Sequence, residues 1–265
     1  MRLERNVRNQ IACNFAVAAG DGELVVTLNN DVDAHPDFLE HLCAPFAGQP
    51  RLGSAAPLLL RPGERQIDSA GLAADRTLSA FARLKGQRPS EAQGEEPVLA
   101  GPDGAAAAFR RAAWTQAGGF NETLLGYMSD FDLVLRLRVA GWDTMLAADA
   151  VAVHVGSATY GHRSGRQRYM AGFGRAYMMR RYGVLRSRVG LRALLTEGMV
   201  VAGDFVLCHD LAALSGRLAG WRAASRSVRA PWPPPRALDE RIDFLESLRL
   251  RRGTYLSQQR GVEAE

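Results

Sequence analysis

The sequence predicts an α/β fold over its first 160 residues and a helical region after them. Short apolar runs with the length of buried strands alternate with segments of helical spacing as far as residue 154. From residue 163 onward the chain becomes rich in arginine, and a proline-rich stretch at 231–235 precedes a short terminal helix. We therefore expect an α/β domain over 1–160, a basic amphipathic helical region over 161–230, and a Pro-rich linker with a terminal helix over 231–265.

The composition is that of a globular protein with a basic surface. The chain has 265 residues, of which 47% are hydrophobic and 23% charged, as in a globular protein with a full core. The net charge of +5 is carried almost wholly by arginine, since Lys85 is the single lysine, and a basic surface favours anionic ligands. The three cysteines are far apart and form neither a disulfide framework nor a zinc spacing, which fits a reducing cytosol. The chain starts without the apolar stretch of a signal peptide, and charged residues interrupt the most apolar stretch, 191–221, so we expect no membrane span.

Two candidate strands carry the main features of the first half. The run 24–28 is short, apolar and β-branched, as buried strands are, and the polar segment 29–33 follows it at once. In open α/β sheets, ligands bind beyond the C-terminal ends of the strands, where this polar segment lies. The second strand, 52–60, contains Pro57, which predicts an edge position or a break.

The remaining elements follow from periodicity and from the positions of Gly and Pro. After Pro36, a residue favoured at the first position of a helix, apolar side chains recur at helical spacing. The other expected elements are helices over 110–118 and 129–140, strands over 145–147 and 151–154, and a mobile loop over 83–97.

The polar segment 29–33 is the first candidate site. A nucleotide sugar carries a diphosphate whose charge must be neutralised before it leaves, and a divalent cation held by carboxylate and amide oxygens does this. Asn29, Asp31 and Asp33 supply oxygen ligands of the kind that Mg²⁺ or Mn²⁺ prefers. Two other interpretations stay open. One is an Asx-rich turn that caps the next helix. The other is a phosphatase site of the haloacid dehalogenase type, which also needs a lysine, and Lys85 lies in the predicted loop.

The second candidate site is the start of the helix predicted over 129–140. Asp132 lies four residues before Arg136, which gives it an ion-pair partner on the helix surface. Asp130 has no cation at those offsets. Such a carboxylate either interacts with the positive end of the helix dipole or, at the rim of a cleft, takes a proton from an attacking hydroxyl.

The third candidate is His154, at the end of the last predicted strand. A single histidine in such a position is usually structural. The alternative is a neutral imidazole that ligates the same metal as Asp31.

These motifs, taken in order, resemble those of family 2 glycosyltransferases of the rhamnosyltransferase-like kind. The resemblance rests on segments 14–20, 28–32, 104–111, 118–122, 129–133, 138–142 and 154–157, with Pro36 and Leu39 behind the second. The match covers roughly residues 9–182, and the order and spacing of the motifs make it specific.

The resemblance implies a GT-A-like fold, related to the Rossmann fold, in which a mixed sheet is flanked by helices and followed by a helical extension. It implies an inverting transfer of a sugar from a nucleoside-diphosphate donor to a polysaccharide or lipid-linked saccharide acceptor, with Asp130 as the catalytic base. Asp31 would ligate the Mg²⁺ or Mn²⁺ ion on the diphosphate, and His154 would complete the metal site. The resemblance also places Asn29 and Asp33 in the donor site, and Gly104, Ala105, Asp132 and Trp142 in the acceptor site.

The chain departs from the family pattern in two ways. Ser129 stands where family members have Glu before the base. The family's first strand and nucleotide-binding turn have no counterpart ahead of residue 9, so we expect a fold truncated at its N-terminus and a weakened donor site. The alternative is therefore a catalytically impaired remnant that acts as a binding protein or has no function.

The segment 163–192 bears on partners and location. Arginines interleaved with aromatic side chains predict a basic amphipathic helix or helix pair that rests on an anionic membrane face. A solvated helix packed on the catalytic domain is the equal alternative. We expect no nucleic-acid binding, because no reading motif accompanies the charge. The expected location is the cytoplasm, with peripheral contact to the inner face of the cytoplasmic membrane.

Overall fold

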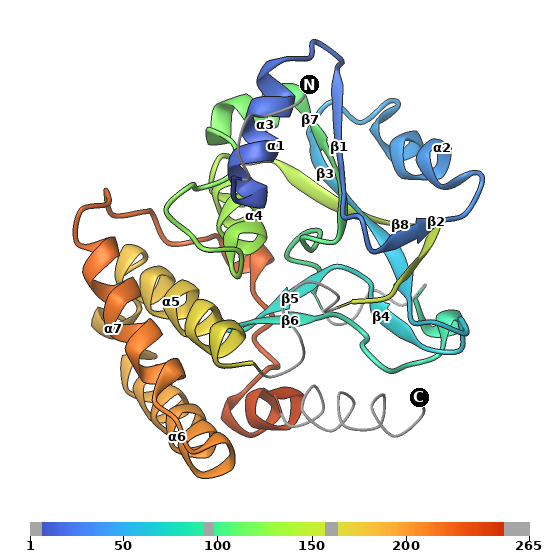
Figure 1. Ribbon diagram of the computed structural model, residues 1–265. Helices are drawn as coiled ribbons and strands as arrows, with labels where there is room; N and C mark the ends of the chain where they lie inside the picture. Colours follow the sequence, from blue (N-terminus) through green and yellow to red (C-terminus); the bar gives the residue numbers. More distant parts are fainter. Residues whose placement is uncertain (1–6, 93–97, 157–163, 252–265) are drawn as a thin grey trace.

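A mixed β-sheet forms the centre of the protein (Figure 1), whose computed structural model describes residues 7–92, 98–156 and 164–251. Its strands are β1 (Leu24–Leu28), β2 (Val32–Ala34), β3 (Leu52–Leu60), β4 (Ile67–Ser69), β7 (Ala106–Arg110) and β8 (Asp143–His154). Their order is β1-β7-β3-β8-β2, with β4 also paired to β3. Strands β3 and β8 run parallel, and the other pairs are antiparallel. The predicted mixed α/β architecture is confirmed.

Helices cover both faces of this sheet (Figure 1). One face carries α2 (Phe38–Cys43) and the turn η1 (Ala44–Phe46); the other carries α1 (Asn9–Ala18), α3 (Arg111–Ala117) and α4 (Ser129–Val139). Successive side chains of β7 point to opposite faces of the sheet and pack against the helices on each face. Ala108 packs in the cluster around Leu42, whereas its neighbour Phe109 packs in the cluster around Trp114.

Three strand predictions need correction. β1 was expected to be buried, but it ends the strand order, and Leu28 is 49% exposed. Pro57 does not lie on an edge strand, because β3 is central and buried throughout. The predicted break is confirmed, since the register of β3 against β8 shifts between Pro57 and Leu58. The two short strands expected at 145–147 and 151–154 are one strand, β8.

The segment expected as a mobile loop is packed where the structure describes it. A two-stranded sheet of β5 (Leu72–Ala74) and β6 (Ala80–Ala82) leads into it. Leu84 is buried, and Ile67 exchanges backbone hydrogen bonds of 2.8 Å with Gly86 and Gln87. Residues 93–97 lie outside the described residues. The part that follows Leu84 is therefore fixed against β4.

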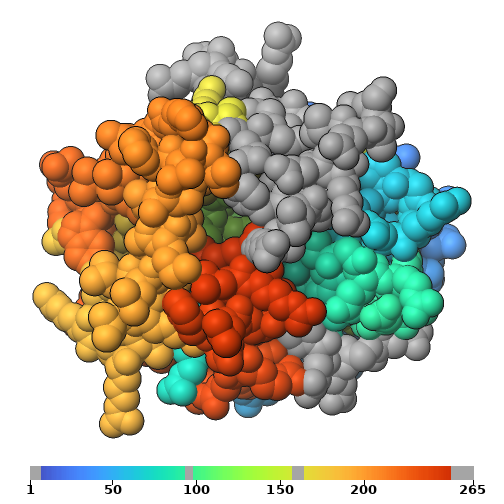
Figure 2. Space-filling view, turned by 90° about the horizontal axis from the view of Figure 1, so that it is seen from below, coloured from blue at the N-terminus to red at the C-terminus, as the bar shows by residue number. Residues whose placement is uncertain are grey.

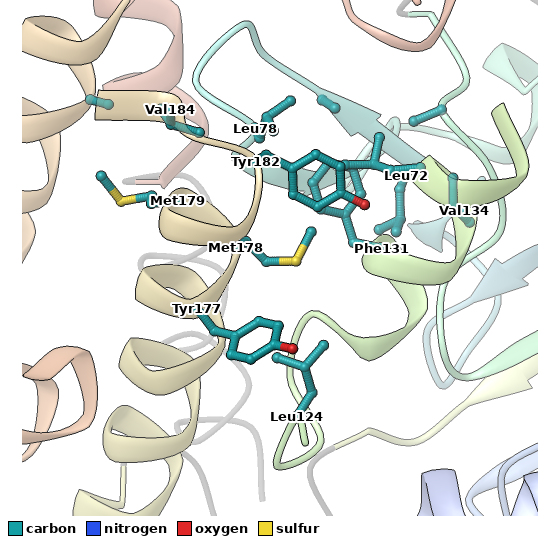
Figure 3. Packing of buried hydrophobic residues seen from close by; sticks show 14 of the residues in the cluster. Leu72, Leu78, Leu124, Phe131, Val134, Tyr177, Met178, Met179, Tyr182 and Val184 are labelled. Carbon is teal, nitrogen blue, oxygen red and sulfur yellow. The ribbon is translucent and has the colours of Figure 1, made fainter. Parts of the chain in front are cut away.

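The helical region shares a core with the α/β part. Its elements are α5 (Gly165–Arg181), η3 (Val184–Arg186), α6 (Gly190–Cys208) and α7 (Ala212–Ala224), followed by a helix over 244–251. Tyr177 and Met178 of α5 point toward Leu124 and Phe131 (Figure 3), and one hydrophobic cluster runs from Leu72 to Leu238. Helix α5 is thus a core helix.

Three arginines of α5 pair with carboxylates of neighbouring elements, whereas Arg166 is exposed, so α5 favours the alternative of a helix packed on the catalytic domain over a basic membrane face. Arg168 pairs with Asp210, the Arg175 Nε atom lies 2.7 Å from an oxygen of Glu197, and Arg181 Nε lies 3.3 Å from an oxygen of Asp132. The carboxylates come from the turn before α7, from α6 and from α4. Sequence spacing does not show such pairings, because the partners are distant along the chain.

Glycines set the contact between α5 and α7. A Cβ added at Gly216 would lie 2.1 Å from the carbonyl oxygen of Tyr169, and one at Gly220 would lie 2.1 Å from that of Phe173. Only glycine leaves room for this approach of the two backbones. Helix α6 lies outside the pair, and in the described part of the chain no helix has the length and apolarity needed to cross a bilayer.

Candidate active site

Two acidic side chains, Asp31 and Asp68, contact His154, and Asp103 connects them electrostatically to Asp130. Asp31 follows β1, Asp68 lies in β4, Asp103 precedes β7, and Asp130 is in the first turn of α4. The antiparallel pairing of β2 with β8 places Val32 opposite His154, which brings the end of β8 to the polar segment after β1. The sheet therefore assembles residues that are far apart in the sequence.

Asp31 and His154 are neighbours, as the resemblance implied. The Asp31 carbonyl accepts a 3.0 Å hydrogen bond from the Val155 N–H, and the Asp31 Oδ2 atom lies 3.7 Å from His154 Nε2. The Oδ1 atom of Asp31 is buried and has no hydrogen-bond partner among the described residues. An unpartnered buried carboxylate oxygen is costly, so this atom is set up to take a ligand.

His154 is held from its other side by Asp68. The Nδ1 atom of His154 lies 2.7 Å from Asp68 Oδ2, and Lys85 Nζ donates a 2.8 Å hydrogen bond to Asp68 Oδ1. Burial opposes ionisation of Asp68, but the hydrogen bond to His154 and the charge of Lys85 lower its pKa to about 2. Burial likewise opposes the charged form of His154, and the hydrogen bond and charge of Asp68 outweigh it and raise the pKa of the imidazole.

The chemistry of this pair fits a divalent cation with two protein ligands. Among residues 7–92, 98–156 and 164–251, no three or more His, Cys, Asp and Glu side chains gather in a way that could hold a metal ion. Asp31 offers an unpartnered buried oxygen, and His154 offers Nε2. Mg²⁺ and Mn²⁺ accept such sets, because substrate phosphates and waters supply the remaining ligands.

Asp130 is a partly buried carboxyl group with a raised pKa. Burial and, less strongly, the charge of Asp103 raise its pKa to about 6, against the hydrogen bonds that the Phe131 and Gly104 N–H groups donate. Next to it, the Ser129 hydroxyl donates to the Gly126 carbonyl at 2.7 Å. A carboxyl group with this pKa is ionised at neutral pH and still accepts a proton well.

The backbone at Gly104 lies against Asp130. A Cβ added at Gly104 would be 3.1 Å from Asp130 Oδ2, so a side chain here would crowd the carboxylate. The Ala105 N–H donates to Asp103 Oδ1 at 2.9 Å, and the Ala105 carbonyl accepts from the Asn29 N–H at 2.8 Å. Asn29, Gly104 and Ala105 thus join the end of β1 to the cluster. Asp33 is exposed on β2, one pairing step from His154.

Two predicted acceptor residues are not brought to this cluster. Asp132 lies about 200° around α4 from Asp130 and is fully buried against Arg136, Arg181 and Tyr182. Its pairing with Arg136 is confirmed, but the pair is not on the surface. Trp142 precedes β8, at the end opposite His154, and its indole N–H donates to Gln116 at 2.7 Å.

Sequence reasoning missed three residues of the cluster. Asp68 and Asp103 belong to no pattern of spacing, and Lys85 was set aside because of its loop. Asp103 is partly buried, and the loss of hydration raises the pKa of its carboxyl group even though Ser69 and the Ala105 N–H donate hydrogen bonds to it. The one available signal was that Lys85 is the single lysine of the chain.

Comparisons with known proteins agree with the motifs. The chain is similar, at 28% identity over 165 residues, to the N-acetylglucosaminyl-diphospho-decaprenol L-rhamnosyltransferase of Mycobacterium tuberculosis, covering 55% of this chain and 53% of the relative. It thus spans about half the length of that relative. A Sinorhizobium fredii protein, y4gI, is 32% identical over 164 residues, or 56% of this chain and 17% of that protein.

Two solved structures show distant similarity. GalNAc-T7 with UDP, GalNAc and Mn²⁺ matches with a TM-score of 0.48 and 13% identity, over 68% of this chain and 38% of that chain. The mannosyltransferase PcManGT from Pyrobaculum calidifontis, in complex with GDP-Man and Mn²⁺, matches with a TM-score of 0.44 and 16% identity, over 96% and 61%. The family model described as glycosyl transferase family group 2 matches residues 24–224, most of the chain. The chain therefore belongs to glycosyl transferase family group 2.

Proposed function

We propose that the protein is an inverting glycosyltransferase that moves a sugar from a nucleoside-diphosphate donor to a hydroxyl group of a polysaccharide or a lipid-linked saccharide. The observation that carries this proposal is the partly buried carboxyl group of Asp130, with its pKa of about 6, beside Gly104 and connected through Asp103 to the pair of Asp31 and His154. A proton acceptor and a diphosphate site on one sheet edge are the two requirements of such a transfer.

Asp130 is the general base in this proposal. It takes the proton from the acceptor hydroxyl as that oxygen forms a bond to the anomeric carbon, on the face opposite the diphosphate. The bond between the anomeric carbon and the diphosphate oxygen breaks, and its electron pair leaves with the diphosphate. The raised pKa of Asp130 favours the proton transfer, and Gly104 leaves room for the acceptor to approach.

Asp31 and His154 are the proposed metal ligands, with Asn29 and Asp33 beside them in the donor site. A bound Mg²⁺ or Mn²⁺ supplies charge neutralisation for the departing diphosphate. Asp68 holds the imidazole of His154 through its 2.7 Å hydrogen bond, so that Nε2 stays directed at Asp31. The metal and the donor would then be held by residues at the ends of β1 and β8, and the acceptor would be bound near Asp130.

The printed name of the mycobacterial relative supports the choice of acceptor. That protein acts on an N-acetylglucosaminyl diphosphate carried by a polyprenol. For this chain we propose a saccharide or lipid-linked saccharide acceptor, used at the inner face of the cytoplasmic membrane.

Calorimetry tests the donor site of the complete chain. UDP and dTDP are titrated with and without Mn²⁺ into the wild type, Asp31→Ala and the matched control Asp21→Ala, which removes an exposed aspartate in the turn before β1. We expect metal-dependent binding that Asp31→Ala abolishes and Asp21→Ala leaves unchanged. Binding that needs no metal, or that survives Asp31→Ala, would contradict the proposed donor site. Absence of binding in the wild type would favour an impaired remnant.

A further inference from the structure

Helix α6 presents a continuous apolar stripe to the surface. Its members are Leu191, Leu194, Leu195, Met199, Phe205 and Val206, each between 51% and 71% exposed. At 3.6 residues per turn these positions fall on one side of the helix. The gaps between them hold Gly198 and Ala202, so no charged side chain interrupts the stripe along α6. Most monomeric soluble proteins do not expose so many adjacent large apolar side chains.

The opposite side of α6 is anchored over the first half of the helix. Glu197 is buried and accepts hydrogen bonds from Arg175 at 2.7 Å and from Arg217 at 2.6 Å. Thr196 is also buried, and Ala193 packs in the main hydrophobic cluster. The rotation of α6 is therefore fixed, and the apolar stripe cannot turn inward. Leu211 and Leu218 extend the exposed apolar surface onto the turn before α7 and onto α7 itself.

Within η3, α6, α7 and the residues up to 229, the exposed charges have one sign, although the exposed Asp243 lies beside the start of α6, where its carbonyl accepts a 2.8 Å hydrogen bond from Arg192. Between η3 and residue 229 the exposed charged side chains are all arginines: Arg186, Arg188, Arg222, Arg226 and Arg229. The acidic residues of the same stretch, Glu197, Asp204 and Asp210, are buried or partly buried. The arginines flank the start of α6 and the end of α7, which meet where Val184, Ala193 and Ala224 share a cluster.

This combination favours an anionic lipid surface over a second copy of the chain. An apolar stripe bordered by cations is typical of helices that lie in the interface of a bilayer, where each arginine near the headgroups adds to binding. Two copies packed through the stripe would bury it, but within the described stretch from η3 to residue 229 no exposed carboxylate is available to pair with the partner's arginines. Charge complementarity therefore selects acidic headgroups.

We propose that α6 lies in the plane of an anionic bilayer surface, with its apolar stripe among the upper acyl chains and the arginines at the level of the headgroups. The proposed membrane contact thus lies on α6 and α7 (Figure 2, gold to orange), whereas the sequence pattern suggested the segment 163–192. The proposal deepens the proposed function, because it says where the enzyme would meet a lipid-linked acceptor. The lipid binding itself does not depend on that function, since it requires neither the donor nor sugar transfer.

Flotation with lipid vesicles tests the proposal on the complete chain. Vesicles of phosphatidylcholine alone and of phosphatidylcholine mixed with phosphatidylglycerol are compared at low and high salt. We expect binding to the mixed vesicles that weakens as salt increases. Leu194→Glu should lower the partition coefficient roughly tenfold or more, because it replaces an inserted apolar side chain with a charge. The matched control is Leu39→Glu on α2, since Leu39 and Leu194 are both 57% exposed and Leu39 lies on a different face of the protein.

Each outcome of this experiment decides the proposal. Retained binding by Leu39→Glu and lost binding by Leu194→Glu, with unchanged circular dichroism spectra, supports it. A second variant, Arg186→Ala with Arg188→Ala, should weaken binding and flatten its salt dependence while leaving the fold intact. Equal binding to both kinds of vesicle, or no binding by the wild type, overturns it. A dimer seen by light scattering without lipid, and split by Leu194→Glu, overturns it in favour of a second copy. If UDP does not bind, the proposed donor site at Asp31 is wrong, but vesicle binding through α6 is still expected.

Discussion

The Nδ1 atom of His154 lies 2.7 Å from Oδ2 of Asp68, on the opposite side of the ring from Asp31. Because the pKa of Asp68 is about 2, its carboxylate can only accept, so Nδ1 carries the proton and Nε2 faces Asp31. A carboxylate behind a histidine in this way fixes both the ring and the tautomer.

Asp68→Ala should therefore weaken Mn²⁺-dependent binding of UDP by roughly 10- to 100-fold. Calorimetry measures the affinity, and ¹⁵N NMR of labelled histidine, with His154→Gln to assign the signal, measures the tautomer. Lys85→Met keeps the hydrogen bond to His154 and removes the other partner of Asp68, so its effect should be smaller. An unchanged tautomer in Asp68→Ala would show that Asp68 does not position the ring.

Asp130→Asn should lower transfer by roughly 10²- to 10⁴-fold and leave UDP binding unchanged, because it removes only the proton acceptor. Steady-state turnover of a donor found by screening, together with calorimetry, separates the two effects. A variant that lost UDP binding along with turnover would indicate a structural role for Asp130.

The pH dependence of sugar transfer should reflect the ionisation of Asp130. Its pKa is raised to about 6, and the base acts as the carboxylate, so kcat/KM should fall as pH decreases through about 6. Asp103→Asn removes a neighbouring negative charge and keeps an oxygen for the Ala105 N–H, so it should move this limb to lower pH. If the pH at which kcat/KM falls is unchanged in Asp103→Asn, the charge of Asp103 does not influence the pKa of Asp130.

Glu197→Gln should destabilise the protein by about 3 kcal/mol, because it leaves buried arginines without their counter-charge. Burial opposes ionisation of Glu197, but the charges of Arg175, Arg217 and Arg251 lower its pKa from the ordinary value of 4.5 to about 2. The stabilisation is therefore complete above pH 4.5 and is lost as pH decreases toward 2. Urea unfolding of both proteins along this pH range should show the difference between them shrinking. A constant difference would mean that the charge of Glu197 is not its source.

Two glycine-to-alanine changes should have opposite effects on stability. Gly220→Ala places a Cβ 2.1 Å from the Phe173 carbonyl oxygen, so α5 and α7 must separate, and the melting temperature should fall. Gly198→Ala on α6 meets nothing within 4 Å and should stabilise the helix by about 0.5–1 kcal/mol. Thermal unfolding measures both. Equal tolerance of the two changes would contradict the close approach of α5 and α7.

Local sequence patterns were enough to predict several helices and strands and the residues at their ends. Gly118, with φ of 77°, ends α3 as expected, and Asp130 lies in the first turn of the helix predicted from its periodicity. That Asp31 and His154 meet was one of two alternatives from the local pattern, and the family resemblance favoured it. In the structure, the pairing of β2 with β8 brings them together.

What the sequence could not predict are pairings between distant residues. The sequence does not show that Arg175 pairs with Glu197, so a membrane surface over 163–192 and a helix packed on the catalytic domain were equal alternatives. Asp68 and Asp103 are unremarkable in the sequence, since their role depends on β4 and the segment before β7 meeting at one sheet edge. Burial, which raises the pKa of Asp130, is likewise a property of the assembled fold.

The strand order also determines how the protein can fold. Leu24 pairs with Arg110, Leu52 with Asp143, and Val32 with His154, so almost every ladder of the central sheet joins segments separated by many tens of residues. Closing such long loops before the contacts form makes folding slow, compared with a helical bundle of similar size. On the ribosome, β3 must wait for β8, and the residues around His154 cannot meet until that last strand has emerged. Until then β2 and one side of β3 lack their partner and are open to mispairing, so production of the protein should depend on the rate of synthesis and on chaperone capacity.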